Sequence, residues 1–252
     1  MPKVTTKPTY GNFKPLSAET RYRLIWRSWG LEKAGKNHFG FTAPGPVFGQ
    51  YFDPGGVEGV AEKFIKGEVE GCEPKEIQAC FYRFKKDSDD QDAAREVMEQ
   101  FTSDYKIALE SARTIQWDET EFWACVRFAN FGRESGMPRD YGPINAFYRG
   151  LLQDAYDAGV NLQLIQKVKE VWKENKRGDS VPSGDYAPQG FKEANYVVQM
   201  NLCHTWEKGQ GFGVQVVNCR QNMEMAGETF YNTNFTEMAM QVFPGTNESD
   251  WC

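Results

Sequence analysis

The residues best suited to chemistry lie near the start of the chain, in the stretch WGLEKAGKNHF at 29–39. Gly30 is followed after four residues by Gly35 and Lys36, the spacing of a loop whose backbone N–H groups wrap phosphate while the lysine neutralises it. Such loops carry Ser or Thr next to hold Mg²⁺, whereas Asn37 stands here. Its amide oxygen can still bind a hard cation, as a neutral and bulkier ligand.

With 24 glycines in the chain, the spacing fits a phosphate loop and equally a glycine turn with a solvated lysine. His38 either contacts phosphate or, as this position favours, packs or caps the following helix. The residues predicted to bind a nucleotide are Gly30, Leu31, Glu32, Lys33, Ala34, Gly35, Lys36, Asn37 and His38.

Acidic and amide residues at other strand ends complete the predicted site. Asp118 closes the short strand TIQW, where nucleotide hydrolases place a carboxylate that holds Mg²⁺. Glu119 and Glu121 could polarise an attacking water, and the same acids would also stabilise the start of a helix. Gln166 ends VNLQLIQ and is either a sensor of the outer phosphate or a plain polar strand end. The predicted catalytic residues are Lys36, Asp118, Glu119, Glu121 and Gln166, and the predicted metal ligands are Asn37 and Asp118.

An alternation of strands and helices must position these residues. Strands are predicted at 22–29, 46–53, 77–84, 113–118, 160–166, 195–206 and 213–221. Helices are predicted at 36–43, 57–67, 88–112, 121–131 and 143–158. The turn-rich, charged segment 173–193 is predicted to be a mobile loop.

This order of elements predicts an α/β fold with a mainly parallel sheet, helices on both faces and an antiparallel C-terminal edge. In such sheets the ligand lies at the carboxyl ends of the strands. We therefore expect Lys36, Asp53, Asp118 and Gln166 to meet at one edge.

The composition limits the classes of function. The 252 residues suit one domain at 21–252 after a polar arm at 1–20 with three prolines. A net charge of −6 argues against attraction of nucleic acid to the whole surface, although a local basic groove stays possible. Neither a membrane-spanning apolar run nor a signal peptide is visible, so a cytoplasmic protein with no membrane partner is expected. The six cysteines are interpreted as buried small residues rather than as a zinc site or disulfides.

Four stretches carry a resemblance to a known family: GLEKAGKN, TAPGPVFGQYFDPGGVEGVAEKF, TIQWDETEFW and the tail from GFKEANYVVQMNL to VFPGT. They resemble the RecA-like P-loop ATPases of the AAA type encoded by tailed bacteriophages, which include single-strand annealing recombinases. The resemblance runs from about residue 22 to the C-terminus. It implies a RecA-like P-loop NTPase core, ATP and Mg²⁺ as cofactors, and a role in DNA recombination, annealing or replication in the host cytoplasm.

The resemblance also implies partners. Single-stranded DNA would lie on the loops 132–142 and 168–193, with Tyr186 or Phe191 stacking on bases. The residues expected to bind DNA are Lys167, Lys169, Lys173, Lys176, Arg177 and Lys192, although lysines in a loop can equally be a solvated linker. Assembly into a ring or filament is expected, with Lys192 or Arg220 completing the site of a neighbouring subunit.

Three departures from the family pattern leave the activity open. Asn37 makes the Walker A motif degenerate, and after Asp53 no glutamate stands at the catalytic position, Glu58 being the nearest. Arg27 and Trp29 stand before the loop where the relatives usually have small or apolar residues. The chain is therefore either an ATPase or a non-hydrolysing nucleotide-binding or structural assembly protein on the same fold. A small kinase is a third interpretation, with a phosphate lid made by Arg133, Arg139 and Arg149.

Overall fold

The computed structural model describes residues 22–84, 90–175 and 178–251. The predicted arm at 1–20, the first residues of the predicted helix 88–112, and Lys176 and Arg177 lie outside the described residues. Within them, no helix has the length and apolar character needed to cross a membrane.

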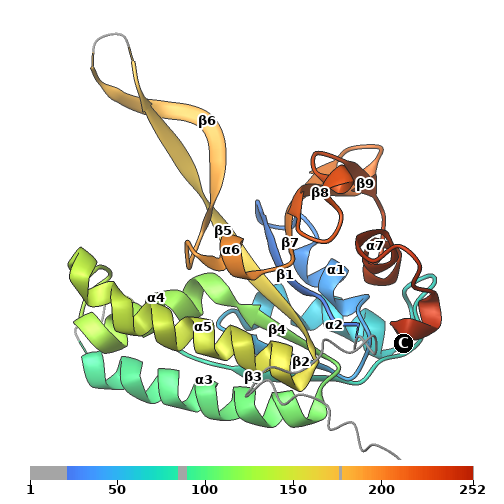
Figure 1. Cartoon of the computed structure of the whole chain (residues 1–252), viewed down its shortest axis with the longest axis horizontal. Coiled ribbons are helices and arrows are strands. Elements are labelled where there is room, and N and C mark those ends of the chain that lie inside the picture. The colour runs from blue at the N-terminus through green and yellow to red at the C-terminus, as the bar shows by residue number, and fades with distance from the viewer. Residues whose placement is uncertain (1–21, 85–89, 176–177, 252) are drawn as a thin grey trace, which may run out of the picture.

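Strands and helices alternate along most of the chain (Figure 1). The strands are β1 (Ile25–Gly30), β2 (Val47–Tyr51), β3 (Ile77–Phe81), β4 (Thr114–Asp118), β5 (Asn161–Glu174), β6 (Ser180–Gln189), β7 (Met200–Glu207), β8 (Gly211–Cys219) and β9 (Thr229–Tyr231). The α-helices are α1 (Lys36–Phe41), α2 (Glu58–Ile65), α3 (Gln91–Ser111), α4 (Glu119–Phe131), α5 (Tyr141–Ala158), α6 (Ala194–Val197) and α7 (Phe235–Val242). Single 3₁₀ turns lie at Pro54–Gly56, Pro138–Asp140, Met223–Met225 and Glu248–Asp250.

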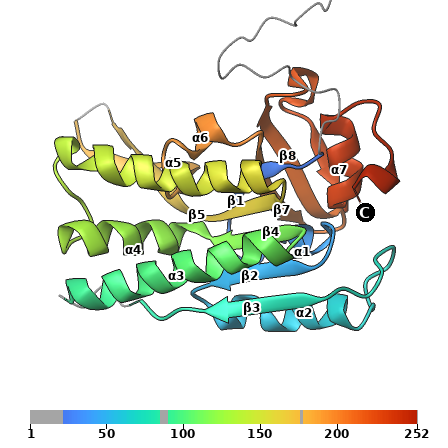
Figure 2. The ribbon, with the colours of Figure 1, turned by 60° about the horizontal axis from the view of Figure 1, so that its bottom comes forward.

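The sheet has the order β3-β2-β4-β5-β1-β7-β8-β9. Its strands run parallel from β3 to β7, and β8 and β9 extend it in antiparallel orientation. Helices α3, α4 and α5 cover one face, and α1, α2 and α7 lie on the other side (Figures 1 and 2). The predicted α/β class, with a mainly parallel sheet and an antiparallel C-terminal edge, is confirmed.

The central strands bury side chains on both sides because helices cover both faces. Ile25 and Leu164 belong to the core formed with α3, α4 and α5. Trp26, the next residue in β1, packs instead against Phe39 of α1 and Phe235 of α7. Successive side chains of a strand point to opposite faces of the sheet. Neighbouring residues of β1 therefore pack in different cores.

The prediction of a mobile loop at 173–193 is wrong for most of its length. Strand β5 continues past the sheet to Glu174, and β6 returns antiparallel to it, so the two form a hairpin that stands out from the core (Figure 1). We call residues 167–189 the hairpin arm. The turn-type residues mark its tip, where the N–H of Asp179 donates to Asn175 Oδ1 at 3.0 Å, and the pairing from Lys167–Gln189 to Glu174–Ser180 forms its strands.

The C-terminal part differs from the prediction in two further places. Ala194–Val197 is a short helix, so the strand predicted at 195–206 begins only at Met200. After β8 the chain adds β9 and α7, which were not predicted. Helix α7 begins with a capping box in which Asn234 and Glu237 accept each other's backbone N–H, so its sequence did carry a start signal.

Candidate functional site

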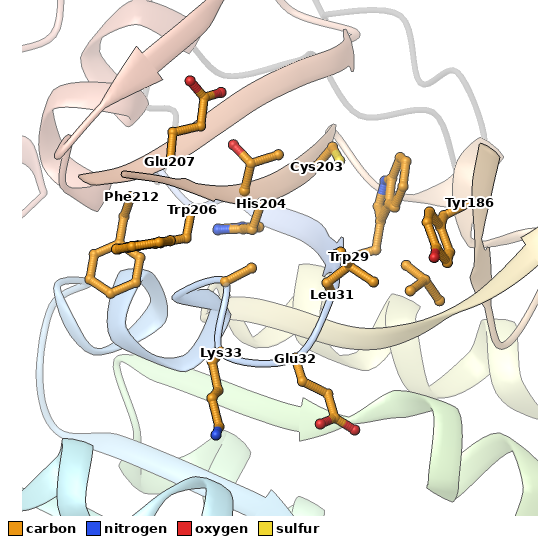
Figure 3. A pocket seen from close by; sticks show the side chains of 14 residues that line it. Trp29, Leu31, Glu32, Lys33, Tyr186, Cys203, His204, Trp206, Glu207 and Phe212 are labelled. Atoms are coloured by element: carbon orange, nitrogen blue, oxygen red, sulfur yellow. The ribbon is translucent and has the colours of Figure 1, made fainter. Parts of the chain in front are cut away.

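The predicted phosphate loop is a tight turn between β1 and α1 (Figure 3). Gly30 has φ +150°, and a side chain there would lie 2.3 Å from the carbonyl oxygen of His204. Gly35 has φ +86°, a conformation that favours glycine. Among the described residues, the backbone hydrogen bonds of turns and loops include none donated by the N–H groups of 32, 33 and 35. A run of unpaired backbone N–H groups is a concavity suited to an anion.

Lys36 folds back under this loop. Its Nζ donates to the carbonyl oxygens of Gly30 and Leu31, each at 2.8 Å. Burial lowers the pKa of Lys36, while the charges of Asp118 and Glu32 oppose that shift. The ammonium is therefore held between the loop and the acid at the end of β4.

The strand register brings the other predicted residues to the same edge. Trp29 of β1 pairs with Gln166 of β5, and Asp118 of β4 pairs with Ile165. The ends of β1, β5 and β4 are thus level, with β5 in the middle. Asp53, after β2, is also close enough for its charge to raise the pKa of Asp118. The structure brings together the four strand-end residues that the sequence predicts to meet.

Asp118 suits a cation held together with phosphate. Burial raises its pKa to about 6, against the charge of Lys167 and a hydrogen bond from the backbone of Phe52. The described residues contain no group of three His, Cys, Asp or Glu able to hold a metal. Mg²⁺, however, is usually bound by one or two carboxylates plus substrate phosphates and water. A single buried carboxylate facing an anion loop fits that ion.

Asn37 contacts the segment after β2. Its Nδ2 donates to the carbonyl oxygen of Gly56 at 3.1 Å, so the side chain links the phosphate loop to the turn that begins at Asp53. Glu58 is exposed at the start of α2. His38 packs between the rings of Phe64 and Phe212, as its position favours.

Glu119 has an environment that its predicted role does not fit. It is fully buried, and its carboxylate accepts from the N–H of Phe191 at 2.7 Å, from Gln166 Nε2 at 2.7 Å and from Tyr148 Oη at 3.1 Å. Burial raises its pKa to about 7, although these donors and Arg27 oppose the rise. A carboxylate enclosed by three donors is suited to a structural role.

Glu121, unlike Glu119, is partly exposed. Its Oε1 accepts from Lys167 Nζ at 2.7 Å, and its charge raises the pKa of Asp118. Lys167 is therefore engaged with the acids of the predicted metal site rather than free for DNA.

Both strands of the hairpin arm are fixed to the residue that follows Glu119. Thr120 Oγ1 accepts from the N–H of Lys167 at 2.9 Å and donates to the carbonyl oxygen of Gln189. The first residues of α4 thus hold the base of the arm, directly beside Asp118 at the end of β4.

The floor of the loop is a buried polar cluster. Gln163 Nε2 donates to Ser28 Oγ at 2.9 Å and to the carbonyl oxygen of Lys36 at 3.0 Å. His204 Nε2 lies 2.9 Å from Ser28 Oγ, and burial lowers the pKa of His204 to about 3. A neutral His204 can accept a hydrogen bond from the Ser28 hydroxyl, and the Ser28 oxygen then accepts a hydrogen bond from Gln163. The cluster fixes the strand ends beneath the phosphate loop.

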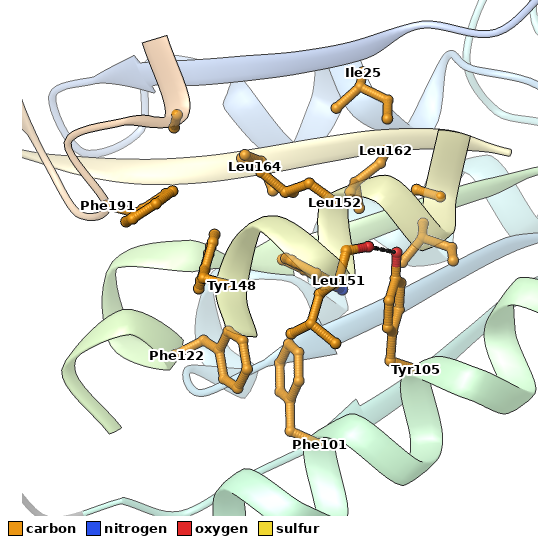
Figure 4. Packing of buried hydrophobic residues seen from close by; sticks show 14 of the residues in the cluster. Ile25, Phe101, Tyr105, Phe122, Tyr148, Leu151, Leu152, Leu162, Leu164 and Phe191 are labelled. Atoms are coloured by element: carbon orange, nitrogen blue, oxygen red, sulfur yellow. Dashed lines mark hydrogen bonds between the residues drawn. The ribbon is translucent and has the colours of Figure 1, made fainter. Parts of the chain in front are cut away.

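The residues expected to bind DNA are dispersed. Lys169 and Lys173 are exposed on the hairpin arm, and Lys192 is exposed beyond its base. Tyr186 is 48% exposed. The stacking role expected for Phe191 is wrong, because its ring is buried against Trp123 and Tyr148, at centroid distances of 4.9 and 4.5 Å (Figure 4).

Two arginines expected to act on a nucleotide, Arg220 from a neighbouring subunit and Arg149 in a phosphate lid, bind other residues in this structure. Arg220 donates to the carbonyl oxygen of Tyr196, and Arg149 forms an ion pair with Glu193. The expected DNA loop 132–142 holds the 3₁₀ turn Pro138–Asp140 and the first residues of α5.

Sequence reasoning missed Arg27, Ser28, Thr120 and His204. Arg27 is buried, donates to Asn195 Oδ1 and has its pKa lowered to about 10 by burial, with the charge of Glu119 opposing. The partners of Ser28 are 135 and 176 residues away in the chain. Spacing within a motif contains no signal for contacts of that range.

No protein-family model matches the chain. No curated protein matches it either. Among solved structures, the crystal structure of the RadB recombinase is similar with a TM-score of 0.44 and 10% identity, over 82% of this chain and 86% of that one. So distant a likeness carries no information about substrate, partner or activity.

Proposed function

We propose that the chain is a RecA-like protein that binds ATP and Mg²⁺ at residues 30–38 and acts on DNA in recombination, single-strand annealing or replication. The observation that carries this proposal is the convergence of three features at one sheet edge. These are the loop N–H groups of 32, 33 and 35, which donate to no backbone carbonyl of a turn or loop, the ammonium of Lys36 and the buried carboxylate of Asp118. Together they offer donors and positive charge to a polyphosphate and a ligand to its metal.

Each residue then has a defined part. Lys36 exchanges its contacts with the carbonyls of Gly30 and Leu31 for the outer phosphates. Mg²⁺, when bound, would neutralise phosphate charge, and Asp118 and Asn37 would hold it. Glu121 is placed to align water, and Gln166 connects this edge to Glu119 and so to the hairpin arm.

A non-hydrolysing nucleotide-binding or assembly protein is the second candidate. The hydrogen bond from Asn37 Nδ2 to the Gly56 carbonyl favours this candidate. Through it the Asn37 side chain links two loops, and Asn37 lacks the hydroxyl that binds Mg²⁺ in hydrolysing relatives. The enclosure of Glu119 by three donors points the same way.

The test is calorimetric titration of the full chain with ATP and Mg²⁺. We expect saturable binding that Lys36→Ala weakens at least about tenfold, since a charged hydrogen-bond partner of phosphate is lost. Lys106→Ala, an exposed lysine of α3, is the matched control and should bind as wild type does. Absence of ATP binding by the wild type would refute the proposal.

Turnover separates the two candidates. ATP hydrolysis is measured with and without single-stranded DNA, in wild type and in Asn37→Thr. An active wild type supports the ATPase. An inert wild type that Asn37→Thr activates supports a nucleotide-binding protein that has lost hydrolysis through the ligand next to Lys36.

DNA binding is proposed for the hairpin arm, where Lys169 and Lys173 are exposed and the strand pair projects from the core. Because Thr120 holds its base next to Asp118, and Glu119 binds Gln166 and Phe191 on either side of the arm, a change at the nucleotide could reach the DNA through these contacts. Assembly into a ring or filament, bacteriophage origin and a cytoplasmic location complete the proposal, on the resemblance in sequence.

A further inference from the structure

A cleft of about 760 Å³ adjoins the phosphate loop on the side of β7. The loop residues 29–34 form one wall, and 203–207 with Phe212 form the other (Figure 3). Tyr186 of the hairpin arm lines it at the end where Trp29 lies. Its volume is in the range of small-molecule sites. We call it the aromatic cleft.

Large apolar side chains line the cleft and are exposed to solvent there. Trp206 is 58% exposed, Leu31 55% and Phe212 36%. Trp206 and Phe212 face each other across the β7–β8 ladder and lie side by side in Figure 3. A concave group of exposed aromatic residues marks a binding site more often than an unused surface.

The aromatic pair is directly beside the start of α1. A side chain at Gly35 would lie 2.7 Å from the Phe212 ring, and that ring stacks on His38 at 5.6 Å. A ligand whose phosphates lie on the loop therefore has its remaining part next to Phe212 and Trp206.

The charge of the cleft selects between occupants. Its lining includes two acidic residues, Glu32 and Glu207, and one basic residue, Lys33. A strand of nucleic acid would bring several phosphates into a wall of net negative charge, whereas a nucleobase is neutral and planar. Aromatic side chains bind bases by stacking on their faces.

We propose that the aromatic cleft binds the base of the nucleotide, with Trp206 and Phe212 as the stacking surface. This rests on the proposed function, because the phosphate loop must hold the phosphates of the same molecule. Binding then has two separable parts, phosphate on the loop and base in the cleft. Contact with a base is a specific role for Trp206, which is too exposed to be a core residue.

The test compares ATP with inorganic tripolyphosphate, which has the phosphates and no base. Each is titrated with Mg²⁺ into the full chain by calorimetry. We expect Trp206→Ala to weaken ATP about tenfold, as the loss of one stacking contact does, and to leave tripolyphosphate unchanged. Trp206→Phe should retain most of the ATP affinity. Trp172→Ala removes an indole of equal exposure, 57%, outside the cleft, and should change neither ligand.

A second readout does not depend on the alanine variant. Stacking of a base should quench the fluorescence of Trp206. ATP should therefore lower the tryptophan fluorescence of wild type and of Trp172→Phe but not that of Trp206→Phe. Tripolyphosphate should not lower the fluorescence of any of the three proteins. If Trp206→Ala weakens both ligands equally or neither, the base lies elsewhere and the inference is overturned while the phosphate loop stands. If the wild type binds neither ligand, the proposed function itself fails and this inference with it.

Discussion

At the scale of single residues, Asp118 and Glu119 are sequence neighbours with opposite surroundings. Burial raises the pKa of both, to about 6 and about 7. Asp118 looks toward Lys36 and the charges of the sheet edge, whereas Glu119 is enclosed by three hydrogen-bond donors. Asp118 is therefore suited to reversible binding of a ligand, and Glu119 to a permanent structural contact.

Glu119 should make the stability of the protein fall as pH rises. Its folded pKa of about 7 lies above its ordinary value of 4.5, so the folded state keeps a proton that the unfolded state has lost. The stabilisation is complete below pH 4.5 and is lost as pH rises through 7. The whole shift corresponds to about 3 kcal/mol. Gln at position 119 cannot ionise. Between pH 5 and 8 we therefore expect the free energy of unfolding of Glu119→Gln to fall by about 2 kcal/mol less than that of wild type.

Urea denaturation at each pH, followed by tryptophan fluorescence, measures this difference. Asp118 and His204 titrate in both proteins, so their effects cancel in the comparison. Glu110→Gln, on the exposed side of α3, is the control and should follow the wild-type curve. Parallel curves for Glu119→Gln and wild type would show that Glu119 does not hold a proton in the folded state.

At the scale of elements, the hairpin arm depends on one hydroxyl at its base. Thr120→Val keeps the shape of the side chain but leaves the N–H of Lys167 and the carbonyl of Gln189 without their partner. We expect the free energy of unfolding to fall by about 1–3 kcal/mol, and amide exchange at Lys167 to quicken more than in the core strands. Hydrogen exchange and urea denaturation measure the two effects.

Thr102→Val is the control for this variant. Thr102 Oγ1 donates to the carbonyl oxygen of Met98 within α3, so its loss leaves no backbone N–H unpaired. Equal destabilisation by both variants, with unchanged exchange in the arm, would mean that Thr120 does not hold the hairpin.

The elements show where sequence information ends. Strands such as Thr114–Asp118 and the helices around them were predictable because their patterns are local. The meeting of Lys36, Asp118 and Gln166 was also predictable, since parallel strands bring their carboxyl ends to one edge. The sequence predicts a loop where the arm lies, because turn residues near Asn175 outweigh the weaker strand pattern on either side. Thr120 could not be assigned, because its partners are 47 and 69 residues away.

At the scale of the whole molecule, the charge opposes the proposed partner. The net charge is −6, so nucleic acid is repelled by most of the surface and must bind through a local feature. The sequence of residues 167–189 holds five cationic and four acidic residues: Lys167, Lys169, Lys173, Lys176 and Arg177, and Glu170, Glu174, Asp179 and Asp185. With Lys167 engaged by Glu121, the proposed binding of DNA would depend on few lysines.

We therefore expect the double variant Lys169→Glu, Lys173→Glu to bind single-stranded DNA at least about tenfold more weakly than wild type. Losing two phosphate contacts should also reduce the slope of log affinity against log salt by about 1.4, at about 0.7 per contact. Fluorescence anisotropy of a labelled oligonucleotide over a salt series measures both. The pair Lys66→Glu, Lys106→Glu lowers the net charge equally from exposed positions on other elements. If that pair weakens binding as much, the affinity for DNA depends on the total charge of the molecule, and the hairpin arm is not the DNA-binding site.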